Sequence, residues 1–400
     1  MKNIFYYFFF LVLTVNAQNE ATQWRFNNNS GLDFSTSPPT PTVGGPVAYN
    51  FCGASMADAS GNLLFYSNGL DVFNNQNMVM ANGNALGGTL SSQAALAIRQ
   101  PGSANVYYLF SNNGFQGLKY AIVDMSLSAG QGSVVIKNQS LVPNIASQFT
   151  AVRHCNGIDS WIITHKLGTN EYDAFLLTSA GISTVPVISA GSLTVTSVTT
   201  DNGQMKASPD GQYIMLNCFS SGTEVSAFNT ATGMVSNSLY LLNNVGSGCE
   251  FSSDGGKLYG VSSQSVILQW DLCVGTALDI IGSMDTIGVS SSTAYGIQLL
   301  QLGPDEKIYA THGNGFQNPS ALGVINFPGV LGSGSNYNDL GQPLVPGSVG
   351  IGLPGFESHL LRAKFNYTAA NSCATATFNM PSPGCKTNGV YNWNFGDPAS

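Results

Sequence analysis

Charged side chains are scarce in this chain of 400 residues. They make up 8% of the sequence, against roughly 25% in an average soluble domain. Long charged helices, coiled coils and ladders of ion pairs are therefore excluded, because each depends on many ionic side chains. The balance is acidic, with 13 Lys and Arg against 21 Asp and Glu. Such a surface does not attract phosphate backbones, so we expect no nucleic acid among the partners.

Several catalytic and metal-binding motifs are also missing. The four histidines form no H-E-x-x-H or H-x-H pattern, and neither a P-loop nor the G-x-S-x-G motif of serine hydrolases occurs. The seven cysteines contain no C-x-x-C pair, which excludes zinc-ribbon and thioredoxin-like sites. We therefore expect no metal site, no cofactor and no identifiable set of catalytic residues.

No apolar run reaches the ~20 residues that a membrane-spanning helix needs. The run from Ile4 to Val15 follows Lys2 and ends at Val15-Asn16-Ala17, which has the form of a signal-peptide cleavage site. A membrane anchor is the alternative interpretation, but the run is too short for it. We expect residues 1–17 to be a signal peptide and no membrane span to remain after its cleavage. The protein is then secreted or held at the outer cell surface.

An exported chain can form disulfides. Cys373 and Cys385 flank a short strand-like segment, so we expect a disulfide between them. Cys218 and Cys249 form a second candidate pair. Because the count of seven is odd, at least one thiol stays free.

Short runs of β-forming residues alternate with clusters of Gly, Asn, Asp and Ser from about residue 24 to 365, while helical periodicity is nearly absent. A repeated unit emerges when the turns are aligned. In Ser208-Pro-Asp-Gly211 a polar turn leads into the apolar strand 212–216, and Ser252-Ser-Asp-Gly255 leads into the strand that follows it in the same way. Asp caps such a turn and Gly supplies a positive φ.

Six copies of this unit are visible, with strands that begin near residues 63, 106, 160, 212, 257 and 307. Their spacing is typical of a four-stranded propeller blade, which takes roughly 40–50 residues. The copies and their flanking strands predict an all-β, seven-bladed β-propeller over residues 18–365, with six or eight blades as alternatives. Trp24-Arg-Phe26 and a strand within 358–365 are the candidates for closing the ring.

The alternation of β-forming runs and polar clusters ends after residue 365. Residues 366–372 have the composition of a linker, and Tyr391-Asn-Trp-Asn-Phe-Gly-Asp-Pro398 follows an alternating strand. This last segment resembles the hallmark of PKD domains, which are Ig-like β-sandwiches, with Pro398 in place of the second family glycine. The resemblance implies that residues 366–400 are a linker and an incomplete PKD domain.

Two N-terminal segments carry a second resemblance. Trp24-Arg-Phe-Asn-Asn-Asn-Ser-Gly-Leu-Asp-Phe34 and Asp58-Ala-Ser-Gly-Asn-Leu-Leu-Phe-Tyr66 are similar to segments of large surface proteins of gliding, Bacteroidota-type bacteria. In that group a propeller precedes PKD domains and a type IX secretion sorting domain. The resemblance implies a secreted or surface-attached protein, associated with gliding motility, and it transfers no catalytic residue.

Four candidate ligand contacts lie near repeat turns or strand ends. His312 ends a repeat strand and begins a glycine-rich segment that contains Phe316, whose ring could stack on a sugar. Arg153 and His154 enter another repeat turn near Asp159. For each of these residues, an ordinary structural contact is the competing interpretation.

Glu250 and Glu357 are the acidic candidates. Most other acids lie in turns, where capping explains them. Glu250 precedes a repeat turn and Glu357 lies in Gly-Phe-Glu-Ser-His359, so either side chain could point to the central channel. Glycoside hydrolysis needs paired carboxylates, and nothing in the sequence pairs these two.

These observations favour a non-catalytic module for binding, adhesion or scaffolding at the cell surface, with a glycan or a protein as its ligand. The alternative is a propeller hydrolase or lyase that acts on a polysaccharide. The alternative requires that carboxylates or a histidine converge at the mouth of the channel, whereas scattered residues favour binding. A purely structural module without a ligand is a third hypothesis.

Overall fold

The computed structural model describes residues 19–26, 30–44, 53–88, 93–113, 116–197, 202–243, 245–262, 266–292, 296–313, 319–361, 366–369 and 376–379. Four predicted features lie outside these residues: the signal-peptide segment 1–17, Phe316, the pair Cys373 and Cys385, and the PKD-like segment 391–398. Those expectations therefore stay predictions. No helix in the described part of the chain is long and apolar enough to cross a membrane.

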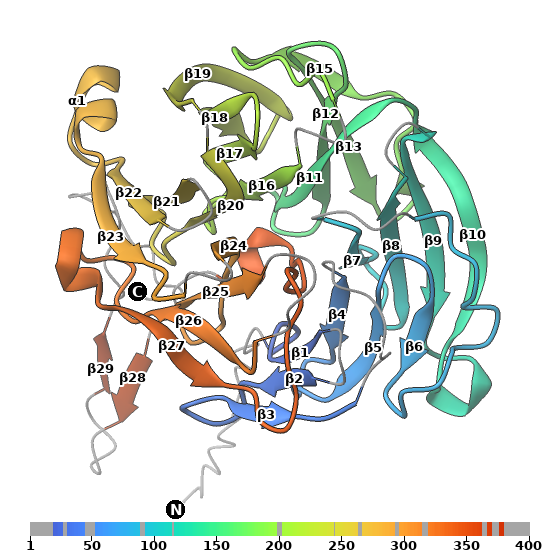
Figure 1. Ribbon diagram of the computed structural model, residues 1–400. Coiled ribbons are helices and arrows are strands. Elements are labelled where there is room, and N and C mark those ends of the chain that lie inside the picture. Colours follow the sequence, from blue (N-terminus) through green and yellow to red (C-terminus); the bar gives the residue numbers. More distant parts are fainter. Residues whose placement is uncertain are drawn as a thin grey trace, which may run out of the picture.

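Seven antiparallel sheets surround a central axis in the described residues (Figure 1). The first three sheets are β1–β3 (Gln23–Phe26, Ser30–Asp33, Thr40–Thr42), β4–β6 (Ala54–Ala57, Leu63–Ser67, Val72–Asn74) and β7–β10 (Ala95–Arg99, Val106–Asn112, Leu118–Asp124, Ser133–Val142). The fourth and fifth are β11–β15 (Ile145–Arg153, Ser160–Lys166, Glu171–Thr178, Gly181–Ile182, Val187–Ala190) and β16–β19 (Gly203–Ala207, Tyr213–Cys218, Gly222–Asn229, Met234–Leu242). The last two are β20–β23 (Val245–Phe251, Lys257–Ser262, Val266–Asp271, Asp285–Val289) and β24–β27 (Gly296–Leu302, Ile308–Gly313, Ala321–Ile325, Tyr337–Pro343).

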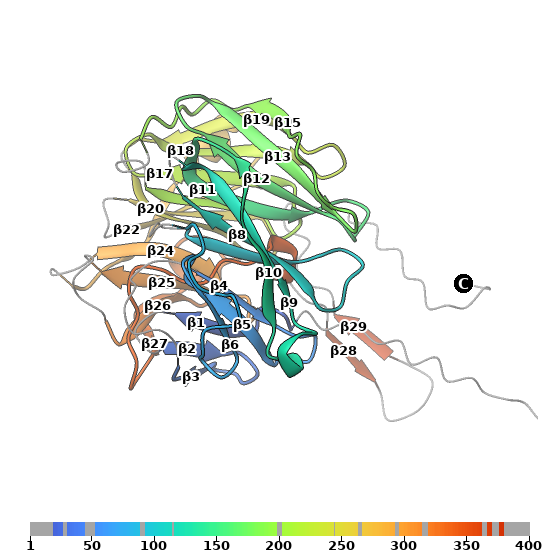
Figure 2. The same ribbon diagram turned by 90° about the vertical axis from the view of Figure 1, so that its right-hand side faces the viewer.

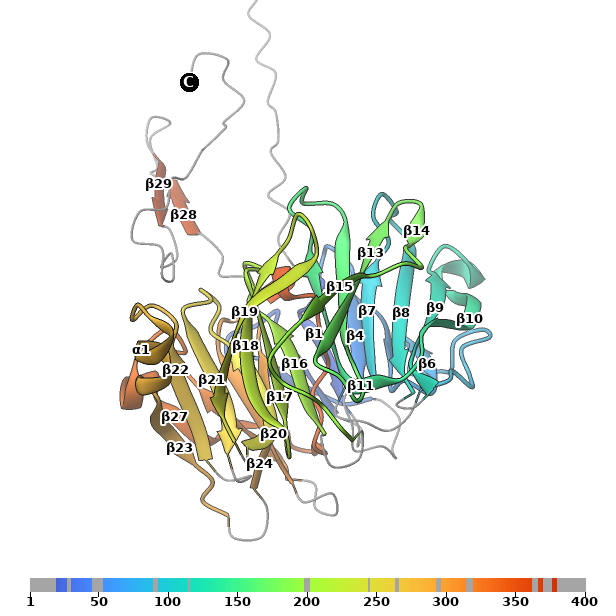
Figure 3. The same ribbon diagram turned by 90° about the horizontal axis from the view of Figure 1, so that it is seen from above.

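This arrangement confirms the predicted all-β, seven-bladed β-propeller. A further pair, β28 (Asn366–Ala369) and β29 (Ala376–Asn379), forms its own two-stranded sheet. The helical elements are short: η2 (Ser128–Gly130), α1 (Ala277–Gly282), η3 (Gly332–Ser335) and η4 (Ser358–Leu361). Figure 3 shows α1 at the rim, beside β22 and β23.

The repeat turns have the predicted geometry. Ser208 Oγ donates to Asp210 Oδ1 over 2.7 Å, and Ser252 Oγ donates to Asp254 Oδ1 over 2.6 Å. Gly211 follows at φ 74°, in the left-handed region that favours glycine. These turns join the first and second strands of their blades at 58–62, 100–105, 154–159, 208–212, 252–256 and 303–307. They therefore share one face of the ring, which we call the repeat-turn face.

Adjacent blades are joined by apolar clusters. Ile162 on β12 packs with Leu96 of the preceding blade, whereas its neighbour Ile163 packs with Met205 and Leu216 of the following blade. Successive side chains of a strand point to opposite faces of its sheet, so each blade contributes to the cluster on either side. This packing explains why the repeated strands are apolar on both faces.

The two ends of the propeller meet in the first blade (Figure 2). Trp24 on β1 stacks on Phe356 at a centroid distance of 5.9 Å and lies edge-on to Tyr309 of the last blade at 5.5 Å. Gly355 forms a parallel bridge with Ala54 on β4. The segment 353–356 thus takes the innermost position beside β1–β3, and the expected closing role of Trp24-Arg-Phe26 is confirmed.

The expected closing strand within 358–365 is not found in 358–361, and residues 362–365 lie outside the described part of the chain. Residues Ser358–Leu361 form the 3-10 helix η4 instead. The chain turns there because Leu360 and Leu361 pack back onto the same apolar cluster as Trp24 and Phe356.

Candidate functional site

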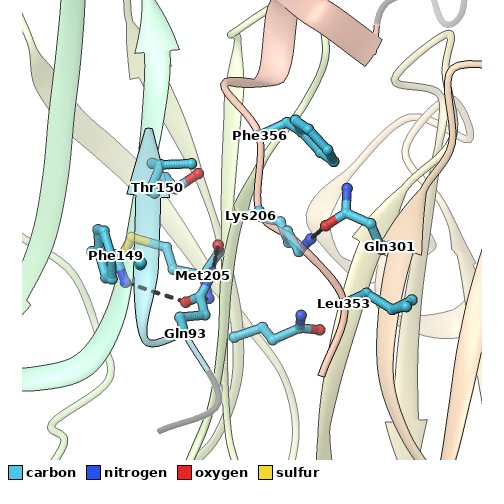
Figure 4. Close-up of a pocket in the computed structure, with 12 residues that line it drawn as sticks. Gln93, Phe149, Thr150, Met205, Lys206, Gln301, Leu353 and Phe356 are labelled. Atoms are coloured by element: carbon cyan, nitrogen blue, oxygen red, sulfur yellow. Dashed lines mark hydrogen bonds between the residues drawn. The ribbon is translucent and has the colours of Figure 1, made fainter. Parts of the chain in front are cut away.

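Side chains of the inner strands surround a small cavity in the central channel. The cavity at its core measures about 20 Å³ and is lined by Gln93, Phe149, Met205 and Leu353 among others (Figure 4). Such a volume holds about one water molecule. Gln93 Oε1 accepts hydrogen bonds from the backbone N–H groups of Phe149 (3.2 Å) and Met205 (2.8 Å), which ties two inner strands together. Among the described residues, this cavity is therefore too small for a ligand larger than water.

Glu250 lies in this core as a structural ion pair. Its Oε2 is 3.0 Å from Lys206 Nζ, and both side chains are buried. The same carboxylate accepts the backbone N–H groups of Phe251 and Leu302, each over 2.9 Å. Lys206 also donates to the Gln301 side-chain oxygen. The charge of Glu250 is thus fully engaged inside the ring.

Glu357 is buried between the segment 353–356, which lines the channel cavity, and the helix η4. Its Oε1 accepts the Ser160 hydroxyl over 2.6 Å, and its Oε2 lies 3.1 Å from Arg153 NH2. The same guanidinium nitrogen is 2.8 Å from His359 Nε2. These contacts fasten the segment that completes the first blade to the fourth blade, on the opposite side of the ring.

A cavity of about 320 Å³ opens beside this contact on the repeat-turn face. We call it the Arg153 cavity. Its walls come from the turns of the fourth and fifth blades and from η4: Arg153, His154, Cys155, Gly157, Pro209, Asp210, Gly211, Thr230, Ser358 and His359. Its volume falls within the range of small-molecule sites, about 300–1,000 Å³.

The polar groups of the cavity are held in place. Asp210 Oδ1 accepts the Gln212 backbone N–H over 3.1 Å, and His154 Nδ1 accepts that of Asn156 over 3.1 Å. Burial lowers the pKa of His359; Glu357 opposes this shift, and Arg153 adds to it. His359 is therefore neutral at neutral pH, and its Nε2 accepts the Arg153 N–H. The cavity therefore offers fixed hydrogen-bond donors and acceptors, and the charge of Arg153 is neutralised by Glu357.

The structure thus brings together three of the six predicted contacts, Arg153, His154 and Glu357. Glu250 lies apart, in the channel core. His312 lies apart on β25, fully buried, with its Nε2 2.8 Å from Asp339 Oδ1 in the last blade.

Asp339 is the centre of that second cluster. It accepts the Tyr337 hydroxyl over 2.7 Å and the Ser291 backbone N–H over 2.8 Å. Burial would raise the pKa of Asp339, but the hydrogen bonds from Ser291, Tyr337 and His312 hold it below its usual value. His312 is therefore the buried member of a partly exposed network, at the end of its strand away from the repeat-turn face.

Sequence reasoning missed Thr230 and His359 as cavity residues. Thr230 belongs to a turn of the fifth blade and carries no motif. His359 lies two residues after Glu357, in the same short segment. Its closeness to a predicted site residue was therefore a sequence signal that could have identified it.

The candidate pair Cys218 and Cys249 is not a disulfide. Neither cysteine is disulfide-bonded, and both are buried, on β17 and β20. Cys249 Sγ lies 3.4 Å from the Gln204 carbonyl oxygen, and burial raises the pKa of its thiol. Cys273 is disulfide-bonded. Cys155 is a free, exposed thiol at the Arg153 cavity.

Within the described residues, no group of three or more His, Cys, Asp or Glu side chains gathers as a metal site would require. The described lining of the Arg153 cavity contains a single acid, Asp210. It does not present the two open carboxylates that flank the bond in most glycoside hydrolases.

No known family model and no curated protein matches the sequence. Distant similarity to solved structures exists. Kluyveromyces lactis Hsv2 is 9% identical, with 75% of this chain and 91% of that chain covered and a TM-score of 0.43. The hydrazine synthase of Kuenenia stuttgartiensis is 12% identical, with 84% and 95% covered and a TM-score of 0.42. The Cps50 (Swd1) β-propeller domain of Myceliophteria thermophila is 10% identical, with 73% and 93% covered and a TM-score of 0.40. No activity is carried over from them.

Proposed function

We propose that this protein is a non-catalytic recognition module, secreted or held at the outer cell surface, that binds a glycan or a protein through its repeat-turn face. The N-terminal segment 1–17 would direct export. The PKD-like segment after residue 365 would continue into a spacer, as in the surface proteins of gliding bacteria that the sequence resembles. The propeller then serves adhesion or capture.

The observation that supports this proposal is the position of the cavities. The channel core has room for about one water molecule, whereas the repeat-turn face carries the Arg153 cavity of about 320 Å³. Arg153, which lines this cavity, is neutralised by the buried Glu357 over 3.1 Å. Because the charged groups at this site are ion-paired or hydrogen-bonded and its other polar groups are neutral, it is better suited to binding a ligand by hydrogen bonds than to proton transfer. Proton transfer needs a free acid or base.

Binding of the full-length protein to an array of glycans and to immobilised polysaccharides tests the proposal, with reducing-sugar release assayed on every hit. We expect binding without release. His154→Ala and Thr230→Ala, which remove cavity side chains, should weaken binding by about tenfold.

The matched control is Lys166→Gln. Lys166 forms an exposed ion pair with Glu171 at the end of β12, on the face opposite the repeat turns, so its loss should leave binding unchanged. Release of reducing sugars would contradict the proposal and support the hydrolase or lyase alternative. If the cavity variants bind as well as the wild type does, the Arg153 cavity is not the binding site.

A further inference from the structure

A second, larger cavity opens on the repeat-turn face, between the first and second blades. It measures about 540 Å³ and is open to solvent along one side. Gln23 on β1 and Asp33 on β2 form one wall, the turn around Asn62 forms another, and Gln76 and Gln131 come from turns of the second and third blades. We call this cavity the amide groove.

Its lining is polar but almost uncharged. Amide side chains from Gln23, Asn62, Asn75, Gln76 and Gln131 line it, and no Lys, Arg or His does so among the described residues. Each amide presents a donor and an acceptor side by side. This pairing matches vicinal hydroxyl groups, which also donate and accept. A phosphate or a polyuronate would instead require cations.

Asp33 supplies the one charge in the groove. Burial would raise the pKa of Asp33, but hydrogen bonds from Ser35 and Gln23, together with the charge of Arg25, hold it below its ordinary value. The carboxylate therefore accepts hydrogen bonds throughout the neutral range. An acidic ligand would be repelled by Asp33, whereas the hydroxyls of an uncharged sugar would donate to it.

The groove also contains an acceptor that the described residues leave unused. The side-chain oxygen of Gln131 is buried and has no hydrogen-bond partner there. A buried polar atom without a partner costs free energy. The oxygen is enclosed as it stands, and rotation of the Gln131 amide toward a ligand donor would remove that cost. This observation is independent of the shape of the groove.

The walls are preorganised by short hydrogen-bonded turns. Asp58 Oδ1 accepts the backbone N–H groups of Ser60 (2.8 Å) and Asn62 (2.9 Å), and Asn74 Oδ1 accepts that of Gln76 (3.0 Å). A ligand would therefore not have to order these turns, which lowers the entropic cost of binding.

Leu63 is the one large apolar side chain among the described residues that line the groove. A peptide ligand needs pockets for its apolar side chains, so the lining favours a sugar over a peptide. From this lining we infer that the amide groove binds an uncharged oligosaccharide through its amides and the Asp33 carboxylate. The inference rests on the proposed function and names the ligand class for a second site on the same face.

The test measures binding of the full-length protein to soluble neutral oligosaccharides (β-1,3- and β-1,4-glucan, mannan and xylan fragments) and to acidic ones (polygalacturonate and alginate fragments). We expect at least one neutral series to bind and neither acidic series to do so. Gln76→Ala and Gln131→Ala should each weaken that binding by about tenfold, while Lys166→Gln should not. Circular dichroism confirms that the variants fold.

The outcomes separate the two proposals. If neutral sugars bind and the groove variants bind them as the wild type does, the groove inference is wrong and the proposed recognition function stands. If the acidic fragments bind in place of the neutral ones, the assigned ligand class is wrong. If no sugar binds but a protein partner is captured through the Arg153 cavity, the groove inference fails alone. If neither a sugar nor a protein binds, both proposals fail.

Discussion

Glu357 shows how one buried carboxylate connects two blades on opposite sides of the ring. It is 3% exposed, and its partners Ser160 and Arg153 both belong to the fourth blade. The contact serves the fold first, because it holds the C-terminal segment in place. It also holds Arg153, which lines the Arg153 cavity, so the stability of the fold and the shape of the cavity both depend on this carboxylate.

Glu357→Ala should lower the free energy of unfolding by about 2–4 kcal/mol, because it strands the buried Arg153 and Ser160 groups. Denaturant unfolding at pH 7 measures the change. Glu171→Ala is the matched control: it removes a carboxylate whose ion pair with Lys166 is exposed, and little change is expected. Equal losses in the two variants would show that the Glu357 contact is not stabilising.

The neutral His359 makes stability depend on pH. Burial lowers its pKa in the folded protein, whereas the unfolded chain has the ordinary value near 6.5. The unfolded state therefore binds the proton more readily between these two values, and the free energy of unfolding falls as the pH drops below about 6.5. Buried His165, whose pKa is also lowered, acts in the same direction.

Denaturation midpoints at pH 7.5 and pH 5.5 measure this effect. His359→Gln keeps an acceptor for Arg153 but cannot be protonated, so the difference between the two midpoints should shrink. An unchanged difference would assign the pH dependence to other groups.

The repeat turn is the smallest unit that defines a blade. Asp254 accepts the Ser252 hydroxyl over 2.6 Å and the Gly256 backbone N–H over 3.0 Å. Asp254→Ala should therefore lower the free energy of unfolding by about 1 kcal/mol, as measured by chemical denaturation. An unchanged midpoint would mean that the strands alone fix the turn.

These turns were predictable because their chemistry is local. Ser, Asp and Gly lie within four residues of one another, and their hydrogen bonds repeat wherever the residues do. The helix α1 also had a local signal, since Thr276 and Asp279 form a capping box. At six residues it was too short to show periodicity.

The contacts of the candidate site were not predictable in this way. Arg153 and Glu357 are 204 residues apart, and their meeting depends on which segment occupies the innermost position of the first blade. The sequence marked both residues but could not pair them. Likewise, the amide groove gathers glutamines and asparagines from three blades, each unremarkable in its own turn.

At the scale of the whole molecule, the C-terminal segment closes the ring. Leu353, Phe356, Leu360 and Leu361 are buried in the cluster that joins the first and last blades. A chain ending at residue 348 should therefore lose cooperative unfolding, whereas a chain ending at residue 361 should keep it. Thermal unfolding followed by circular dichroism distinguishes the two. Cooperative unfolding of the shorter chain would show that the ring closes without the segment.

Recognition on the repeat-turn face is the central claim at this scale. Amide hydrogen exchange of the full-length protein, with and without the tightest-binding sugar or protein from the screen, tests it without any choice of variant. Protection should concentrate in the turns that line the Arg153 cavity and the amide groove, at 154–159, 208–212 and 58–62. Protection confined to the opposite face, at the turns 167–170 and 219–221, would contradict the account.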